Sequence, residues 1–158
     1  MGVVITQEEI SSIRKKLKDK NSKIVFTNGC FDIVHRGHVE YLTKAKQLGD
    51  VLFVGINSDA SCKRIKGEKR PIVSESDRAF LLSSLIPVDY VALFDEDTPF
   101  NLISKILPDI LVKGADWSVE NIVGKDIVEK NGGSVATITF VPNRSTTNIV
   151  DRILELYR

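Results

Sequence analysis

The sequence predicts an α/β fold in which a parallel sheet is covered by helices. Five short runs of residues are mostly apolar, and the segments between them carry apolar residues at helical spacing. One run, residues 51–56, is apolar almost throughout, which is typical of a strand buried on both faces of a sheet. Alternating strands and helices favour parallel pairing with right-handed crossovers. We therefore expect a doubly wound, Rossmann-like sheet of five strands with helices on both faces.

The elements follow one another in a regular order. The expected strands are residues 23–27, 51–56, 90–94, 110–112 and 134–140. The expected helices are residues 7–20, 37–48, 75–85, 99–107, 125–131 and 146–156, with a short helical stretch after residue 58. Thr6, Ser74 and Thr98 are suitable N-caps for the first, third and fourth of these helices, and Gly49 is a suitable C-cap for the second.

The bulk properties indicate one domain of 158 residues, with an N-terminal helical segment at 1–22 and the main core at 23–158. A net charge of +1 argues against a nucleic-acid-coating protein. The absence of a long apolar run and of a signal peptide argues against a membrane or secreted protein. Two cysteines without C-x-x-C spacing favour a reducing compartment, so we expect a cytoplasmic protein.

A strand, a glycine turn and a helix start follow one another between residues 24 and 38. The apolar run stops at Asn28 and Gly29, and a helix is expected to open near Gly37. Such a corner receives anions, because a helix N-terminus presents free backbone N–H groups. The only two histidines of the chain, His35 and His38, stand three residues apart at this helix start. A zinc site with Asp32 as third ligand is the less favoured alternative.

Polar residues follow the ends of most expected strands and should meet at one edge of a parallel sheet. They are Thr27, Asn28, Asp32, His35 and His38 after the first strand, 57–59 after the second, 113–117 after the fourth and 143–147 after the fifth. The motif R-S-T-T at 144–147 begins a second helix, where hydroxyls and free N–H groups hold phosphate oxygens. A plain N-cap is the alternative for that motif.

A basic loop lies between the second strand and the following helix. It contains Lys63, Arg64, Lys66, Lys69 and Arg70, and Arg78 follows on the next helix. These cations either form a solvated charge run or clamp a departing pyrophosphate. The chain contains no G-x-x-x-x-G-K-[ST] loop, no G-x-G-x-x-G turn and no nucleophile elbow. Direct attack between two bound phosphates is therefore the favoured chemistry.

The motifs H-R-G-H at 35–38 and R-S-T-T at 144–147 resemble the two phosphate motifs of the nucleotidyltransferase superfamily. Within it, the chain is most similar to the adenylyltransferase domain of the bacterial ADP-heptose synthesis enzyme. This resemblance extends over residues 23–153 and includes the segments N-G-C-F-D-I-V-H-R-G-H, K-G-E-K-R-P-I, L-P-D-I-L-V-K-G-A-D-W and S-T-T-N-I-V. It implies transfer of AMP from ATP, with Mg²⁺, to D-glycero-β-D-manno-heptose 1-phosphate, giving ADP-heptose and pyrophosphate.

The resemblance also implies roles for individual residues. The catalytic residues would be His35, His38 and Lys66. The nucleotide-binding residues would be Thr27, Asn28, Gly29, Cys30, Phe31, Asp32, Lys113, Gly114, Asp116, Trp117, Arg144, Ser145, Thr146 and Thr147. Further phosphate contacts would come from Lys63, Lys69, Arg70 and Arg78. No residue is expected to be a dedicated metal ligand.

Two other functions stay open at this point. Arg144 stands where heptose enzymes often carry Cys or Tyr, and arginine there resembles cytidylyltransferases that act on glycerol 3-phosphate. A non-catalytic nucleotide-binding module is the third hypothesis. The expected partners are ATP and a sugar 1-phosphate, with no nucleic acid and no membrane. We also expect a homodimer, with residues 81–88 as a candidate face, and a separate sugar kinase, since no kinase domain is recognisable in these residues.

Overall fold

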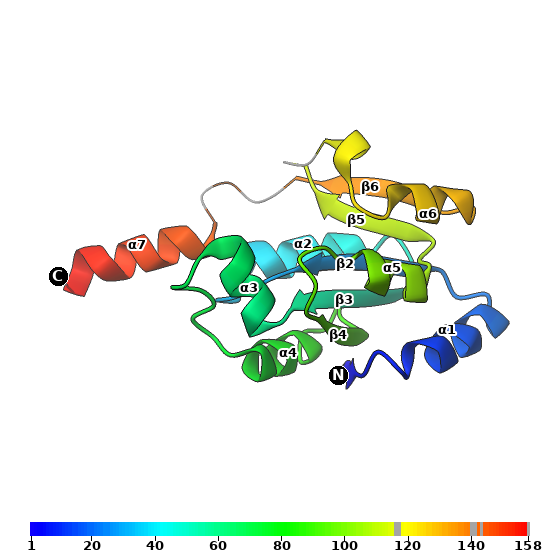
Figure 1. The fold of residues 1–158 in the computed structure, drawn as a ribbon, viewed down its shortest axis with the longest axis horizontal. Helices are drawn as coiled ribbons and strands as arrows, with labels where there is room; N and C mark the ends of the chain where they lie inside the picture. Colours follow the sequence, from blue (N-terminus) through cyan, green and yellow to red (C-terminus); the bar gives the residue numbers. More distant parts are fainter. Residues whose placement is uncertain (116–117, 140–141, 143, 158) are drawn as a thin grey trace.

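The computed structural model describes residues 1–115, 118–139, 142 and 144–157. Figure 1 shows a single sheet with helices packed around it. The strands are β1 (Val3–Ile5), β2 (Ile24–Gly29), β3 (Val51–Asn57), β4 (Tyr90–Phe94), β5 (Ile110–Gly114) and β6 (Ser134–Ile138). The helices are α1 (Ile10–Asp19), α2 (Arg36–Lys46), α3 (Asp59–Lys66), α4 (Glu75–Ser83), α5 (Phe100–Ile106), α6 (Lys125–Lys130) and α7 (Thr146–Tyr157), with a 3₁₀ turn η1 at Val119–Asn121.

The sheet has six strands in the order β1-β4-β3-β2-β5-β6, and every neighbouring pair is parallel. The five expected strands are all present with small shifts at their ends, but the expected total of five is wrong. The sixth strand, β1, lies at the sheet edge, where Val3 is in register with Tyr90 and Ile5 with Ala92. Three residues are too few to show a strand periodicity, so β1 owes its conformation to pairing with β4.

Side-chain hydrogen bonds help to determine the residue at which two of the helices begin. The first helix begins at Ile10 rather than at residue 7, and its N-cap is Glu9, so the expected N-cap at Thr6 is wrong. The carboxylate of Glu9 accepts a hydrogen bond from the backbone N–H of Thr6 at 2.7 Å and holds a turn ahead of the helix. The N-cap at Ser74 is confirmed, since its hydroxyl accepts the backbone N–H of Asp77 at 3.3 Å.

Two other expected caps are wrong. Helix α5 begins at Phe100, with Pro99 rather than Thr98 at its N-cap. Gly49 is not a left-handed C-cap, because α2 already ends at Lys46 and the backbone of Gly49 has no positive φ. A Cβ at position 49 would lie 2.7 Å from the carbonyl oxygen of Lys23, so this glycine permits close contact with the start of β2.

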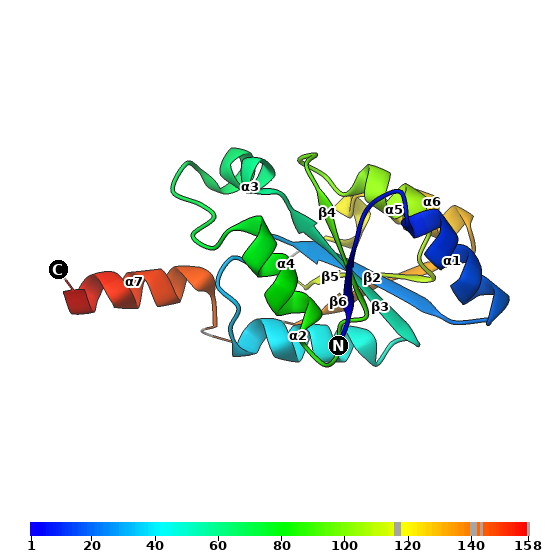
Figure 2. The same cartoon turned by 90° about the horizontal axis from the view of Figure 1, so that it is seen from below.

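The central strands are buried on both faces, as their apolar sequence predicts. Val25 packs into a cluster with side chains of α2 and α4, while its neighbour Phe26 packs into a second cluster with α1, α5 and α6. In Figure 2, α2 and α4 lie on one side of the sheet and α1 and α5 on the other. The alternation of side chains along each strand therefore divides the core into two layers.

The chain order reverses at β2, which lies between β3 and β5. Residues 24–29 of β2 pair with residues 51–56 of β3 along the whole strand. Towards β5 only two pairs form, Val25 with Ile110 and Phe26 with Leu111. The carboxyl ends of β2 and β5 therefore separate, and they open a crevice at the topological switch point, where α/β sheets bind ligands.

Helix α7 extends beyond the carboxyl edge of the sheet, away from the other helices (Figure 1). None of its described side chains is buried. Among the described residues, no helix has the length and apolarity needed to cross a membrane.

Candidate active site

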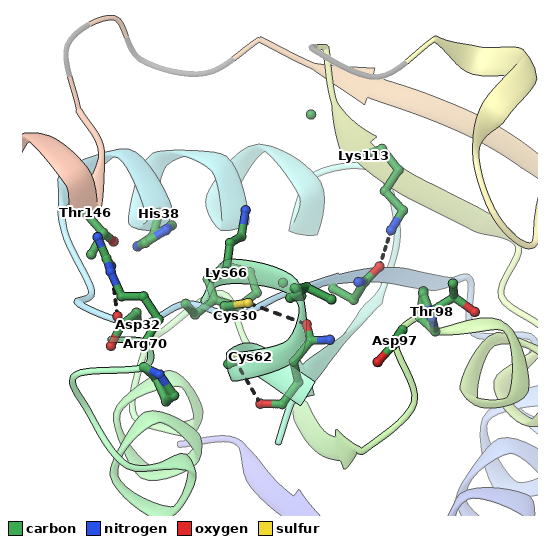
Figure 3. Close-up of a pocket in the computed structure, with 18 of the residues that line it drawn as sticks. Cys30, Asp32, His38, Cys62, Lys66, Arg70, Asp97, Thr98, Lys113 and Thr146 are labelled. Carbon is green, nitrogen blue, oxygen red and sulfur yellow. Dashed lines mark hydrogen bonds and ion pairs between the residues drawn. The ribbon is translucent and has the colours of Figure 1, made fainter. Parts of the chain in front are cut away.

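A cavity of about 710 Å³ opens at the carboxyl edge of the sheet, next to the switch point (Figure 3). Its walls come from the segments that follow β2, β3, β4 and β5, from α2 and from the start of α7. The residues that line it are Asn28, Gly29, Cys30, Phe31, Asp32, His38, Tyr41, Asn57, Cys62, Ile65, Lys66, Arg70, Pro71, Asp97, Thr98, Pro99, Lys113, Gly114, Val123, Thr146 and Thr147. Most of the nucleotide-binding residues expected from the sequence are thus brought together.

One end of the cavity, which we call the histidine end, is lined by His38 and the start of α7, with His35 stacked on His38 outside the cavity lining. His35 is the N-cap of α2, and its ring stacks on that of His38 with centroids 3.8 Å apart and planes 20° apart. The ring of Phe31 meets His38 edge-on at 5.2 Å. A Cβ at Gly37 would lie 3.0 Å from the His35 ring, so the glycine of H-R-G-H allows the two imidazoles to stack.

Both imidazoles are neutral at pH 7. Burial, followed by the nearby His35, lowers the pKa of His38 to about 4, and burial, followed by Arg144, lowers the pKa of His35. The Nδ1 atoms of both rings are buried without a hydrogen-bond partner among the described residues. A buried polar atom without a partner is costly, so this end of the cavity is suited to a polar ligand.

The start of α7 completes the histidine end. The Ser145 hydroxyl caps this helix by accepting the N–H of Asn148 at 3.1 Å, while Thr146 and Thr147 line the cavity. If Gly37 carried a Cβ, that atom would lie 3.1 Å from the Cβ of Arg144. The R-S-T-T segment therefore packs against the start of α2. Two helix N-termini therefore meet beside the histidine pair, as an anion site requires.

Asp32 holds the basic loop in place. Its buried carboxylate accepts hydrogen bonds from the Arg70 guanidinium at 2.9 Å and from the backbone N–H groups of Ile72 and Val73 at 2.7 and 2.9 Å. Both carboxylate oxygens are thus occupied, so Asp32 does not serve as the third zinc ligand considered from the sequence. The described residues contain no group of three His, Cys, Asp or Glu side chains placed to hold a metal ion.

The predicted phosphate contacts of the basic segment divide into two groups. Lys66, the last residue of α3, and Arg70 line the cavity, whereas Lys63 and Lys69 are exposed and do not contribute to its described walls. Arg78 is fully buried outside the cavity lining. Its guanidinium donates to the carbonyls of Val73, Cys30 and Asn57 and to the carboxylate of Asp59, so a phosphate contact by Arg78 is wrong and its role is to hold the loops together.

The opposite end of the cavity, which we call the lysine end, is formed by Lys113 and Asn28. The Lys113 ammonium donates to the side-chain oxygen of Asn28 across the gap between β5 and β2. Burial lowers the pKa of Lys113 to about 8. No carboxylate pairs with this lysine among the described ion pairs. In Figure 3 His38 and Thr146 lie at one side of the cavity, Lys113 at the other, and Lys66 between them.

Some residues stand apart from the expected set. Thr27 is buried beneath the cavity, where its hydroxyl hydrogen-bonds to that of Tyr41 at 2.8 Å. Asp116 and Trp117 lie outside the described residues, so their predicted contact with the nucleotide stays a prediction. The segment 97–99 lines the cavity and was not predicted as part of the site from strand ends, although it follows β4 and the same rule applies to it.

Known proteins resemble this chain over most of its length. Residues 26–152 match the family described as cytidylyltransferase-like. A protein named bifunctional protein HldE from Geobacter metallireducens is 56% identical over 94% of this chain, and one of the same name from Nitratiruptor sp. is 58% identical over 92%. The chain spans 30% of the length of the first relative and 31% of the length of the second.

Two solved structures are also similar. The crystal structure of a lipopolysaccharide core biosynthesis protein from Thermoplasma volcanium is 32% identical, covers 76% of this chain and 97% of its own, and gives a TM-score of 0.62. A pantoate-beta-alanine ligase from Francisella tularensis, 15% identical over 98% of this chain and 80% of its own with a TM-score of 0.63, shares the fold.

Proposed function

The chain belongs to the cytidylyltransferase-like family of nucleotidyltransferases, and we propose that it transfers AMP from MgATP to D-glycero-β-D-manno-heptose 1-phosphate. The products would be ADP-heptose and pyrophosphate. The observation that carries the transferase chemistry is the histidine end, where two stacked neutral imidazoles and two helix N-termini surround one side of a cavity. The choice of acceptor is supported by the ordered motifs shared with heptose adenylyltransferases.

The histidine end is suited to the β- and γ-phosphates. Free N–H groups at the starts of α2 and α7 would bind their oxygens, with the hydroxyls of Thr146 and Thr147 beside them. His35 and His38 would donate hydrogen bonds to the α-phosphate and to the bridging oxygen that leaves. Lys66 and Arg70 would neutralise the departing pyrophosphate, because both face the cavity.

In-line transfer requires the nucleophile and the leaving group on opposite sides of the α-phosphorus. With pyrophosphate at the histidine end, the acceptor phosphate would approach from the lysine end. Lys113 would then offset the negative charge that gathers where the α-phosphate and the acceptor phosphate meet. A buried ammonium without a carboxylate partner binds anions more strongly than a solvated one does.

The bonds exchanged are few. An acceptor phosphate oxygen forms a bond to the α-phosphorus, and the bond from that phosphorus to the α,β-bridging oxygen breaks, so pyrophosphate leaves with the electron pair. The acceptor phosphate is already anionic and needs no general base, so alignment and charge stabilisation account for the catalysis. Mg²⁺ would enter bound to the triphosphate of the substrate, as is usual for this ion.

A substrate panel tests the proposal. The protein is incubated with ATP or CTP and with the heptose 1-phosphate or glycerol 3-phosphate, and pyrophosphate release is measured. We expect release with ATP and the heptose phosphate. Release only with CTP and glycerol 3-phosphate would establish the alternative suggested by Arg144, and no release with any pair would favour a binding module.

The cellular setting is also a proposal. A sugar 1-phosphate has to be made by phosphorylation of a sugar, so a sugar kinase would act before this enzyme. Two free cysteines support the expected cytoplasmic location. Within the candidate dimer face, Leu82 and Val88 belong to the core while Leu81 and Ile86 are exposed, so only part of it is free to pair. Sedimentation of the protein at micromolar concentration would detect the proposed homodimer.

A further inference from the structure

The two cysteines of the chain meet in the wall of the cavity (Figure 3). Cys30 directly follows β2, whereas Cys62 lies in α3, 32 positions later. The Sγ of Cys30 is 3.9 Å from the side-chain oxygen of Asn57, and the Sγ of Cys62 is 3.7 Å from the carbonyl oxygen of the same residue. Both thiols thus contact the same residue, and both belong to the wall of the cavity. No sequence motif indicates this pair, because only the fold brings the two segments together.

The backbone around the thiols is held by one side chain. The buried guanidinium of Arg78 donates to the carbonyl of Cys30 at 2.6 Å and to the carbonyl of Asn57 at 2.9 Å. Asn57 in turn donates from its side-chain amide to Ser61, the residue before Cys62. A connected set of hydrogen bonds therefore holds the two segments that carry the thiols.

The two thiols differ in reactivity. The neighbouring Cys62 thiol, assisted by the charges of Lys66 and Arg78, lowers the pKa of Cys30 to about 7 against the effect of its burial. The neighbouring Cys30 thiol and burial raise the pKa of Cys62. Cys30 is partly exposed at the cavity and Cys62 is buried. A partly exposed thiol of lowered pKa thus lies near a buried thiol of raised pKa, as a nucleophilic and a resolving cysteine do.

We propose that Cys30 and Cys62 form a reversible redox modification site, at which a peroxide converts the pair to a disulfide and stops nucleotidyl transfer.

In the first step, the Cys30 thiolate attacks one oxygen of hydrogen peroxide. An S–O bond forms, the O–O bond breaks, and hydroxide leaves and is protonated to water. In the second step, Cys62 loses its proton and attacks the Sγ of Cys30. The S–S bond forms, the S–O bond breaks, and a second water leaves. Two electrons pass from the thiols to the peroxide, and a dithiol reductant reverses the change.

The inhibition rests on the proposed function, since it requires that this cavity bind the nucleotide. Cys30 precedes Phe31, which contacts His38, and Asp32, which holds the basic loop. Cys62 lies one helical turn before Lys66 on α3. A disulfide would therefore tie the loop of the histidine end to the helix that carries Lys66, and would alter the positions of both relative to the triphosphate.

The test uses the full chain, reduced and then treated with hydrogen peroxide near neutral pH. Free thiols are blocked by alkylation, linked peptides are identified by mass spectrometry, and pyrophosphate release and ATP affinity are measured on the same sample. We expect a Cys30–Cys62 linkage, a fall in transfer of at least tenfold, recovery with dithiothreitol, and slower oxidation when ATP is bound.

Cys62→Ala is the control variant, with Cys62→Ser as a second choice if the first does not fold. Its transfer rate in the reduced state is measured first and is the reference for its peroxide-treated sample. After peroxide, its Cys30 should be trapped by dimedone as a sulfenic acid, and excess peroxide should inactivate it in a way that dithiothreitol does not reverse. Wild-type protein without the linkage, or linked protein with unchanged ATP affinity and transfer, would overturn the proposal. If the reduced protein transfers no nucleotide at all, the proposed function fails, while the linkage and its effect on ATP affinity still decide on the redox site.

Discussion

The two ends of the cavity achieve anion binding by different physical means. At the histidine end the hydrogen-bonding groups are mainly neutral, namely two imidazoles of lowered pKa and the N–H groups of two helix starts, with the charge of Arg144 nearby. At the lysine end a single buried ammonium is held by Asn28. Neutral donors gain strength from fixed geometry, whereas a buried cation gains it from poor solvation. Under the proposed function, the histidine end would position the triphosphate, while the lysine end would respond to the charge that arrives with the acceptor.

The largest effect is expected at the histidine end. In His38→Ala, pyrophosphate release should fall by about 10²–10³-fold, because one preorganised donor to the reacting phosphate is removed. ATP affinity, measured by calorimetry, should change much less, since helix N-termini still hold the other phosphates. Arg36→Ala is the matched control in the same motif, because Arg36 is exposed and paired with Glu40. Near-normal turnover in His38→Ala would remove the catalytic role from this residue.

A smaller loss is expected at the lysine end. Lys113→Met keeps an apolar stem of similar size but removes the charge, and kcat/KM for the acceptor should fall by roughly 10–100-fold, in line with the loss of one charge-assisted contact. The pH profile adds a second test. With a pKa of about 8, Lys113 loses its proton above pH 8, so wild-type kcat/KM should decline there. An unchanged alkaline decline in the variant would assign it to another group.

A substitution at Asp32, which holds the basic loop, should reduce activity less than a substitution of a residue that contacts the substrate. Asp32→Asn weakens the hydrogen bonds to Arg70, Ile72 and Val73 and removes the negative charge beside the guanidinium. We expect the free energy of unfolding to fall by about 1–3 kcal/mol and the KM for ATP to rise by roughly tenfold or less. Urea denaturation and steady-state kinetics measure the two effects. An unchanged KM would mean that the loop does not take part in binding ATP.

The smallest expected effect is the pH dependence of ATP affinity. The pKa of His38 lies at about 4 in the free protein, below its ordinary value of 6.5, and a bound triphosphate should raise it. At pH values between the pKa of His38 in the free protein and its raised pKa in the ATP complex, the complex holds more protons than the free protein. ATP affinity should therefore increase as the pH falls, by less than tenfold per pH unit. Calorimetry in buffers of different ionisation enthalpy should show proton uptake. Equal uptake by His38→Ala would assign the proton to another residue.

The sequence predicted the histidine end far better than the lysine end. Each part of the former is local, since H-R-G-H marks a helix start after a glycine turn and R-S-T-T marks another. Asn28 and Lys113 of the lysine end were predicted singly, as polar residues after a strand and as nucleotide-binding residues. Their contact was not predicted, because it depends on how β2 and β5 separate. Arg78 was misjudged for a related reason. Whether a cation on a helix faces a ligand or oxygen atoms of the protein itself depends on residues far along the chain.

What the sequence determined by itself was the order of the elements, the edge of the sheet at which polar residues gather, and the two helix starts that lie beside the cavity. These follow from periodicity, turn residues and capping, all of which act over a few residues. Only the tertiary structure decided the edge strand β1, the carboxylate that holds the basic loop, the lysine that bridges the switch point and the meeting of Cys30 with Cys62. These contacts join residues distant in sequence, and no local pattern specifies which distant partners will meet when the core closes.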